Sequence, residues 1–372
     1  MKVSQARRTI HIMHMTRMKP TITRSLKLIN ISAPLLALAV CLSGLAAAAD
    51  KDSAKQLLKL TGGRRAKVVW NQGAENAQKV MFLDTKDGEI QELPIAFGSA
   101  PLLTQDGRWV LVSAGKPPND RKVIVYDIET KKTLETPAGP GNNLLAVWQD
   151  PKTKRVWVYV NDCGDKGEPW DVPAGNIYRF PIDKPAAREL FWERTSSHIY
   201  LMFSADGTRA CLEPSWSNIG QLSLVYDAQG KCDQDKSVFK PIGGGCFPSL
   251  SPDNLYRMFR LEGDHRAISM TDADGANPRK VEVTGMLTEA QKANNTWLSR
   301  WSTDPRYLTL VAPAGPNAQI WLGRFDEKAT KIEAWARVSA EQGPQCWQSQ
   351  AWIEPGRSAG TATGSRGVTL NK

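Results

Sequence analysis

Residues 248–253, Pro248-Ser249-Leu250-Ser251-Pro252-Asp253, place one apolar residue directly before a tight turn, and a β-rich run follows the turn. The same order of apolar anchor, turn and β-rich run recurs along the chain. The anchors are Leu103, Trp148, Phe203, Leu250, Trp301 and Trp352, which are 45, 55, 47, 51 and 51 residues apart. A period of this length indicates a repeat protein.

A second element trails each anchor. It is an alternating strand that ends in Asp and a turn, as in Val123-Ile124-Val125-Tyr126-Asp127. The related residues are Asp84, Asp127, Asp183, Asp227, Asp272 and Asp326. Alternation bounded by turn residues indicates strands, and four short strands fit into about 50 residues. The sequence therefore predicts an all-β six-bladed β-propeller of four-stranded antiparallel blades. A β-sandwich with chance periodicity of Asp-Gly turns is the alternative.

The two ends of the repeat are incomplete in complementary ways. The first strands, at residues 66–71, 79–84 and 89–94, lack an anchor strand, and the last strand, at residues 346–354, lacks followers. Together they make one blade. We therefore expect the C-terminal strand to complete the first blade and close the ring, which removes exposed sheet edges.

The run Ile268-Ser269-Met270-Thr271-Asp272-Ala273-Asp274-Gly275, behind the stretch at residues 248–253, resembles the repeat of the TolB-like six-bladed propellers. The resemblance covers residues 62–356 and implies a propeller. It does not extend to the additional N-terminal domain of TolB, because residues 50–61 suit only a short helix, at Asp52 to Leu60, and a linker. In the repeat, the Asp272 turn is interpreted as one in which Asp caps backbone amides rather than as a calcium loop.

The chain of 372 residues carries a net charge of +10, but the excess lies at its ends. Residues 1–49 hold seven Lys and Arg and no acid, and residues 357–372 hold Arg357, Arg366 and Lys372 and no acid. The body between them is balanced at 38 against 38. A neutral body offers no net field to phosphates, so we expect no nucleic-acid partner.

Residues 1–49 have the features of a secretory signal peptide: basic residues, a short apolar run and small residues at its end. A lipoprotein signal is disfavoured because Val40 precedes Cys41. No other stretch approaches the length of a membrane span, so we expect a periplasmic or secreted protein, monomeric, with a disordered tail at residues 357–372. Export permits disulfides, but the pairing of Cys163, Cys211, Cys232, Cys246 and Cys346 stays open.

The longer connections, at residues 115–121, 161–176, 215–221, 284–296 and 312–318, are expected on the face opposite the tight turns. Long loops in a compact repeat are more often functional than short ones, which makes this face the expected recognition surface. Counting back from the anchors places six unlike residues at the channel mouth on the same side. They are Ser99, Asn143, His198, Cys246, Thr296 and Trp347. A structural lining of the channel would also show such variety.

Aromatic and basic residues are the further binding candidates. Trp170 and Trp216 lie in long loops, and Trp297 and Trp347 enter strands at the mouth. Exposed Trp suits sugar rings, peptides and protein hot spots, although loop Trp residues can also fold back onto their own blade. By contrast, Trp148, Trp301 and Trp352 are expected in the core. His198 and His265 are the only histidines after residue 49, and each could be structural or functional.

No cofactor or metal is expected. Some propellers of related appearance are lyases on acidic sugars that hold a metal by several histidines, and two histidines cannot supply that site. A metal-free reaction could still use Arg257, Arg260, Arg300, Glu213 and Glu262.

The first hypothesis for the function is an exported, noncatalytic binding propeller for a protein or glycan partner. The alternative is a carbohydrate hydrolase or lyase with its active site at the channel mouth.

Overall fold

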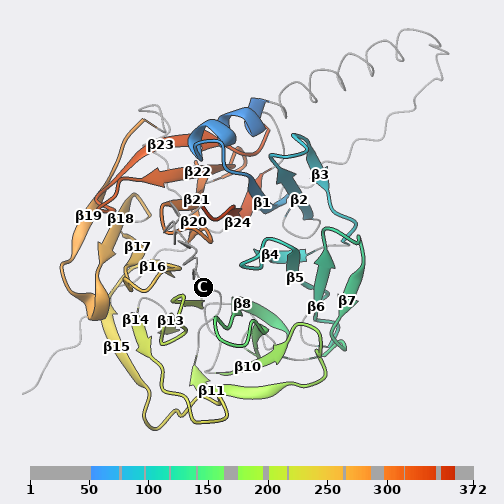
Figure 1. Cartoon of the computed structure of the whole chain (residues 1–372), viewed down its shortest axis with the longest axis vertical. Coiled ribbons are helices and arrows are strands. Elements are labelled where there is room, and N and C mark those ends of the chain that lie inside the picture. The colour runs from blue at the N-terminus through green and yellow to red at the C-terminus, as the bar shows by residue number, and fades with distance from the viewer. Residues whose placement is uncertain are drawn as a thin grey trace, which may run out of the picture. The chain divides into compact units, whose positions relative to one another are not determined.

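A computed structural model describes residues 52–74, 78–95, 98–116, 119–139, 141–162, 175–195, 201–215, 218–262, 265–285, 297–313, 315–340 and 345–356. All of them lie in the unit formed by residues 44–372. Within this unit antiparallel sheets follow one another around a common centre, as the colours of Figure 1 show. The fold is therefore all-β, with a propeller-like arrangement of four-stranded blades, as the sequence predicts.

Three of the blades consist of consecutive strands. They are β4 (Gly98–Leu103), β5 (Trp109–Ala114), β6 (Lys122–Asp127) and β7 (Thr133–Glu135); β8 (Asn143–Gln149), β9 (Val156–Asn161), β10 (Gly175–Pro181) and β11 (Glu189–Thr195); and β12 (Met202–Phe203), β13 (Arg209–Ser215), β14 (Asn218–Ser223) and β15 (Val238–Gly243). In each blade the first strand lies innermost.

A fourth blade is assembled from both ends of the described chain. Its order is β24 (Cys346–Ile353), β1 (Ala66–Gln72), β2 (Lys79–Asp84) and β3 (Ile90–Glu92). β24 runs antiparallel to β1, with Ala66 opposite Ile353 and Trp70 opposite Ser349. The predicted pairing of the C-terminal strand with its N-terminal counterpart is confirmed at this position.

The remaining strands form one eight-stranded sheet in place of two separate blades. Its halves are β16 (Cys246–Leu250), β17 (Met258–Glu262), β18 (Ala267–Thr271) and β19 (Arg279–Val283), and β20 (Trp297–Trp301), β21 (Tyr307–Ala312), β22 (Gln319–Phe325) and β23 (Lys331–Arg337). The outer strands β19 and β23 join the halves by a parallel pairing of Glu282 with Lys331 and Val283 with Ile332. This junction was not expected from the repeat.

The apolar core lies between neighbouring blades. One cluster joins Val69 and Phe82 of the first blade to Val110 and Val112 of the next. Burial also falls from the centre outward: every residue of β21 is buried, whereas every residue of the edge strand β7 is exposed. This gradient explains why the sequences of inner strands are continuous apolar runs, because neighbouring blades cover both faces of these strands.

Anchor tryptophans pack against the turn of the following blade. Gly107 and Gly207 have φ of +68° and +72°, and an added Cβ would lie 2.5 Å from the Trp352 ring and 2.4 Å from the Trp148 ring. The indole nitrogens donate to Gln105 O at 3.0 Å and to Ser204 O at 3.1 Å. Glycine is needed in both turns because of the left-handed backbone and the close ring.

Most predicted anchors are buried, with Trp301 at 0% and Trp352 at 7% exposed. Trp148 is an exception. It is only partly buried, so it packs against a core cluster as the sequence predicts but is not enclosed by it. Its ring lines the inter-blade cavity described below.

The repeated Asp residues mainly order turns. Asp127 accepts hydrogen bonds from Glu129 N at 2.9 Å and from Arg108 Nη2 at 2.8 Å. The Arg108 guanidinium is the main reason that the pKa of Asp127 lies far below its usual value. Asp272 differs from the prediction, because its carboxylate accepts from the side chains of Asn277 and Arg279, each at 2.9 Å, and caps no backbone amide of the 3₁₀ turn η1 (Ala273–Gly275).

Residues 52–60 form a helix that covers the joint between the first and last blades. Its residues Ala54, Leu57 and Leu60 belong to the same core cluster as Val311 and Ile320. Leu60 O accepts a hydrogen bond from Arg324 Nη1 at 3.1 Å. In the described part of the chain, no helix has the length and apolar character needed to cross a bilayer.

Trp352→Ala tests the packing of β24 against the next blade. We expect a loss of about 3–5 kcal/mol in the free energy of unfolding, because the change opens a cavity in a buried joint and removes the bond to Gln105 O. Urea unfolding followed by circular dichroism measures it. Leu255→Ala, at a residue that is 62% exposed, is the control and should cost about 0.5 kcal/mol or less. A cost below about 1 kcal/mol for Trp352→Ala would contradict this packing.

Candidate functional site

Innermost strands begin at the end of the propeller-like arrangement that carries most of the longer connections, whereas the link at residues 224–237 lies at the other end. Asn143 is the first residue of β8, Cys246 the first of β16, and Trp297 the first of β20. Trp347 is the second residue of β24. These four positions are referred to below as the channel mouth. Strand geometry thus brings together residues that are far apart in the sequence.

The Asn143 side chain is fixed on both sides. Its Nδ2 donates to Asn161 Oδ1 at 3.0 Å, and its Oδ1 accepts from Arg121 Nη1 at 3.1 Å. Asn161 is fully buried, whereas Asn143 is half-buried. The amide is therefore held in one orientation at the surface of the mouth, and its position does not depend on a ligand.

Trp347 is also half-buried, and its Nε1 donates to Gly73 O at 2.9 Å. The bond ties the indole to the β1–β2 link of its own blade. Because the N–H group is used internally, a partner would meet the exposed part of the ring and not its donor.

Other predicted residues are placed only in part. The strand that contains Trp297 is described, but its side chain is not, and the same holds for Ser99. Trp170, Trp216, His198 and Thr296 lie outside the described residues. His265 contacts Phe247 in the β16–β18 part of the eight-stranded sheet, with ring centroids 5.1 Å apart and ring planes tilted by 60°.

Arg300 lies between the innermost strands and not at the mouth. Its residue is 6% exposed and lines a cavity of about 40 Å³ at the centre, together with Met202 and Gln350. The same cavity touches Gln105 and Thr303, which belong to the tight turns at the opposite end. A cavity of this size suits ordered water and not a ligand.

Cys246 is the half-buried thiol of the mouth, while Cys211, Cys232 and Cys346 are buried, and these four cysteines form no disulfide with one another. Burial, with the negative charge of Glu213 added, raises the pKa of the Cys246 thiol to about 11. At neutral pH the group is therefore a thiol and a poor nucleophile. Cys163 lies outside the described residues. Among the described residues, no three His, Cys, Asp or Glu side chains gather as a metal site would require.

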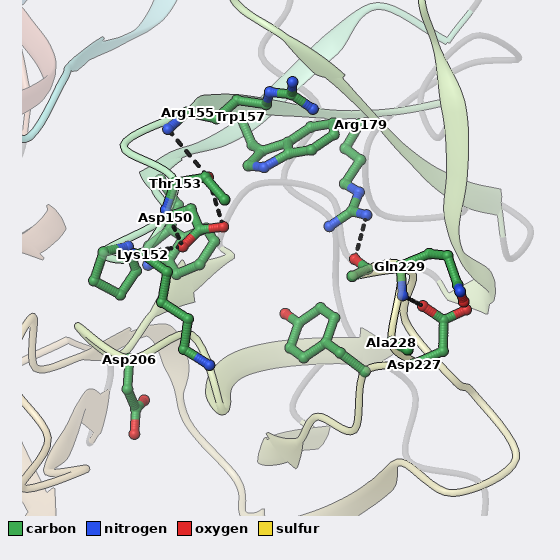
Figure 2. Close-up of a pocket in the computed structure, with 14 residues that line it drawn as sticks. Asp150, Lys152, Thr153, Arg155, Trp157, Arg179, Asp206, Asp227, Ala228 and Gln229 are labelled. Atoms are coloured by element: carbon green, nitrogen blue, oxygen red, sulfur yellow. Dashed lines mark hydrogen bonds between the residues drawn. The ribbon is translucent and has the colours of Figure 1, made fainter.

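A second opening lies on the other face, between the β8–β11 blade and the β12–β15 blade. This inter-blade cavity has a volume of about 370 Å³ and is shown in Figure 2. The turn after β8 forms one wall, with Asp150, Lys152 and Thr153, and the link after β14 forms another, with Asp227 and Gln229. Because both connections lie on the tight-turn face, the cavity is at the opposite end from the channel mouth.

Arg179 fixes the walls of the inter-blade cavity relative to each other. Its guanidinium lies 4.2 Å from the centroid of the Trp157 ring and donates through Nη2 to Gly230 O at 2.7 Å and through Nε to Glu189 Oε1 at 2.6 Å. It is 4% exposed. A charge so deeply buried requires such partners, so the guanidinium acts here as a structural tie between two blades.

Sequence reasoning did not identify this cavity. Its walls are built from residues interpreted as repeat markers, such as Trp148 and Asp227, and from the turn at residues 150–155. One signal was present: the link at residues 224–237 is much longer than its counterpart at residues 128–132. An irregular copy within a repeat is a place where the surface departs from the common blade.

No protein-family model and no curated protein matches the chain. Similar solved structures include TolB from Acinetobacter baumannii, with a TM-score of 0.52 and 12% identity over 79% of this chain and 69% of that chain. An auxiliary nutrient binding protein from Bacteroides thetaiotaomicron has a TM-score of 0.45 and 10% identity over 66% of each chain. A chain of a nidogen/laminin complex has a TM-score of 0.48 and 8% identity over 77% of this chain and 98% of that chain. The likeness to TolB concerns the fold alone, and it confirms the TolB-like propeller arrangement that the sequence resemblance implies.

The thiol of Cys246 provides a chemical test of the mouth. At pH 7.5 we expect iodoacetamide to modify it about a hundredfold more slowly than a free cysteine, because little thiolate is present. Glu213→Gln removes the nearby negative charge, lowers the pKa, and should speed the reaction about two- to fivefold. Peptide mass spectrometry follows each site. Cys346 is the internal control, and its rate should not respond to Glu213→Gln. Modification of Cys246 at the rate of a free cysteine would contradict its environment.

Proposed function

We propose that this chain is an exported, noncatalytic binding propeller of six blades, with the eight-stranded sheet counting as two and the pairing of β24 with β1 closing the ring. Its long-loop face and channel mouth hold a protein or glycan partner. In this proposal residues 1–49 are a signal peptide, residues 50–61 a helix and linker, residues 62–356 the propeller, and residues 357–372 a tail. The mature protein acts as a monomer in the periplasm or outside the cell.

The observation that carries this proposal is the pre-ordered pair of unlike side chains at the mouth. Asn143 offers an amide that Arg121 and Asn161 hold in place, and Trp347 offers part of a ring whose N–H group is already bonded. Both residues lie at the mouth ends of innermost strands, and partly exposed aromatic rings and fixed polar groups are each typical of recognition surfaces. Because these groups are ordered without a ligand, binding would cost little side-chain entropy.

The alternative of a carbohydrate hydrolase or lyase has less support. It needs an acid and a base near one substrate position. In the β16–β17 hairpin, Arg260 Nη2 and Glu262 Oε1 lie 2.6 Å apart and so engage each other. Cys246 is held as a thiol by burial and by Glu213. These groups fit a structural or binding role better than catalysis.

A glycan array and a capture experiment with envelope extract test the mouth. We expect Trp347→Ala and Asn143→Ala to weaken binding of the captured partner about tenfold or more, as for a residue at the centre of an interface. Trp109→Ala, at a half-buried position on the tight-turn face, is the matched control and should bind as the wild type does. A partner captured equally well by all four proteins would refute the role of the mouth.

Export is tested separately. Expression of the full chain in a bacterial cell, followed by fractionation and mass spectrometry, should yield a soluble envelope species that begins at Ala49 or Asp50. The basic start and apolar run of residues 1–49 are the physical reason. Retention of intact residues 1–49 on a cytoplasmic protein would contradict it.

A further inference from the structure

The inter-blade cavity defined above lies on the face opposite the channel mouth and plays no part in the proposed function. We infer that it is a second binding site, which takes one or two rings of an uncharged saccharide. The inference stands on three features of the cavity: ordered walls, balanced charge, and aromatic rings interleaved with hydrogen-bonding groups.

The long link at residues 224–237 is an ordered wall. Tyr226 and Cys232 form an isolated β-bridge across it, and Val225 N donates to Ser237 Oγ at 2.9 Å. Burial raises the pKa of the Tyr226 hydroxyl, which stays protonated and donates to Gly207 O at 3.1 Å. With the Arg179 bond to Gly230 O, the link is tied both to its own blade and to the neighbouring β8–β11 blade. Such pre-organisation favours small-ligand binding.

The opposite walls are equally fixed. Burial opposes ionisation of Asp150, but hydrogen bonds from Lys152 N at 2.8 Å and from Thr153 outweigh it, so the pKa of Asp150 lies below its usual value. Asp206 accepts from Tyr256 Oη at 2.7 Å. Burial also opposes ionisation of Asp206, but its hydrogen bonds hold its pKa below the usual value, so both carboxylates are charged acceptors at neutral pH. Asp150 is held by its own turn and Asp206 partly by Tyr256, which lies outside the lining.

The lining carries no net charge. Lys152, Arg155 and Arg179 supply three positive groups, and Asp150, Asp206 and Asp227 supply three negative ones. The carboxylates would repel a phosphate or a polyanion, and the cationic groups would repel a polyamine, so neither an anionic nor a cationic ligand is favoured. A neutral ligand that both donates and accepts hydrogen bonds matches this lining, and a hydroxyl group does both.

Donors remain available at the rim. Within the described residues, the Lys152 ammonium and the Arg155 guanidinium have no hydrogen-bond partner, and both residues are exposed. Figure 2 shows the Lys152 side chain extending toward the hollow, across from Gln229. The Arg155 guanidinium also lies 5.5 Å from the centroid of the Trp157 ring. The cavity thus presents donors without hydrogen-bond partners on one wall and charged acceptors around it.

Three half-buried rings, Trp148, Trp157 and Tyr226, complete the lining. The apolar C–H face of a sugar ring packs on such aromatic surface while its hydroxyls reach the polar rim. The volume of about 370 Å³ lies near the lower end of the range for small-molecule sites. It suits one or two sugar rings and not a long chain or a folded domain.

Isothermal titration calorimetry on the purified protein tests this site with maltose, cellobiose and diacetylchitobiose. Glucuronic acid and glucosamine serve as anionic and cationic probes. We expect at least one neutral disaccharide to bind, and the charged probes to bind about tenfold more weakly or not at all. If no neutral disaccharide binds when it is titrated to about 20 mM, its Kd is weaker than about 20 mM and the proposal is overturned. Preference for a charged probe would also overturn it.

Variants locate the binding. Trp157→Ala should weaken the neutral disaccharide about tenfold. Trp109→Ala, the counterpart at the start of β5 with Arg108 4.9 Å from its ring centroid, should leave the affinity for the disaccharide unchanged.

If Trp157→Ala lowers the melting temperature strongly, Lys152→Ala and Asp227→Asn, at two exposed residues, replace Trp157→Ala. Each is expected to weaken binding about threefold. Affinity that is unchanged in these variants, or lost in Trp347→Ala, would place the sugar elsewhere and overturn the proposal. Because Trp347→Ala reports on the mouth, failure of one site is distinguished from failure of the other.

Discussion

The antiparallel pairing of β24 with β1 is the constraint on which the other contacts depend. It brings Ile353 opposite Ala66, and around this junction the core collects residues from β1, β21, β22, β24 and the helix at residues 52–60. Trp352, on the same strand, then packs over Gly107 of the next blade. These contacts join segments that are distant in the sequence. Forming them costs the conformational entropy of closing a long loop, and they can form only when both ends of the chain are present. The first blade is complete only once the last strand has joined it.

Much of this architecture could be predicted from the sequence, because it repeats. The anchors Leu250 and Trp301 and the turn markers Asp84 and Asp127 mark the same positions in successive copies, so the strands, their antiparallel order and the pairing at residues 346–353 follow from the period. The parallel pairing of Val283 with Ile332 could not be predicted, because it joins outer strands of different copies and no residue pattern specifies it.

The candidate sites were less predictable for the same reason, since a ligand site is a departure from the repeat. Asn143 was found by counting from an anchor, but its bonds to Arg121 and Asn161 depend on side-chain geometry. Trp148 occupies an anchor position, yet it lines a cavity whose other wall comes from the link at residues 224–237, and this link is longer than its counterpart at residues 128–132. Arg179 carried no sequence signal at all, because a single arginine in an alternating strand is ordinary. Its burial against Trp157 and its bond to Gly230 O arise from blade packing.

The register of β24 on β1 also decides how the protein would respond to mechanical load. Since Ala66 pairs with Ile353, the start of β1 and the end of β24 lie at the same end of the paired strands. Tension applied through the two ends would open the hydrogen bonds one after another, in the manner of a zipper, and would not load them all at once as in shear. A force on the termini would therefore release β24 first, and with it the seat of Trp352, before any complete blade unravels.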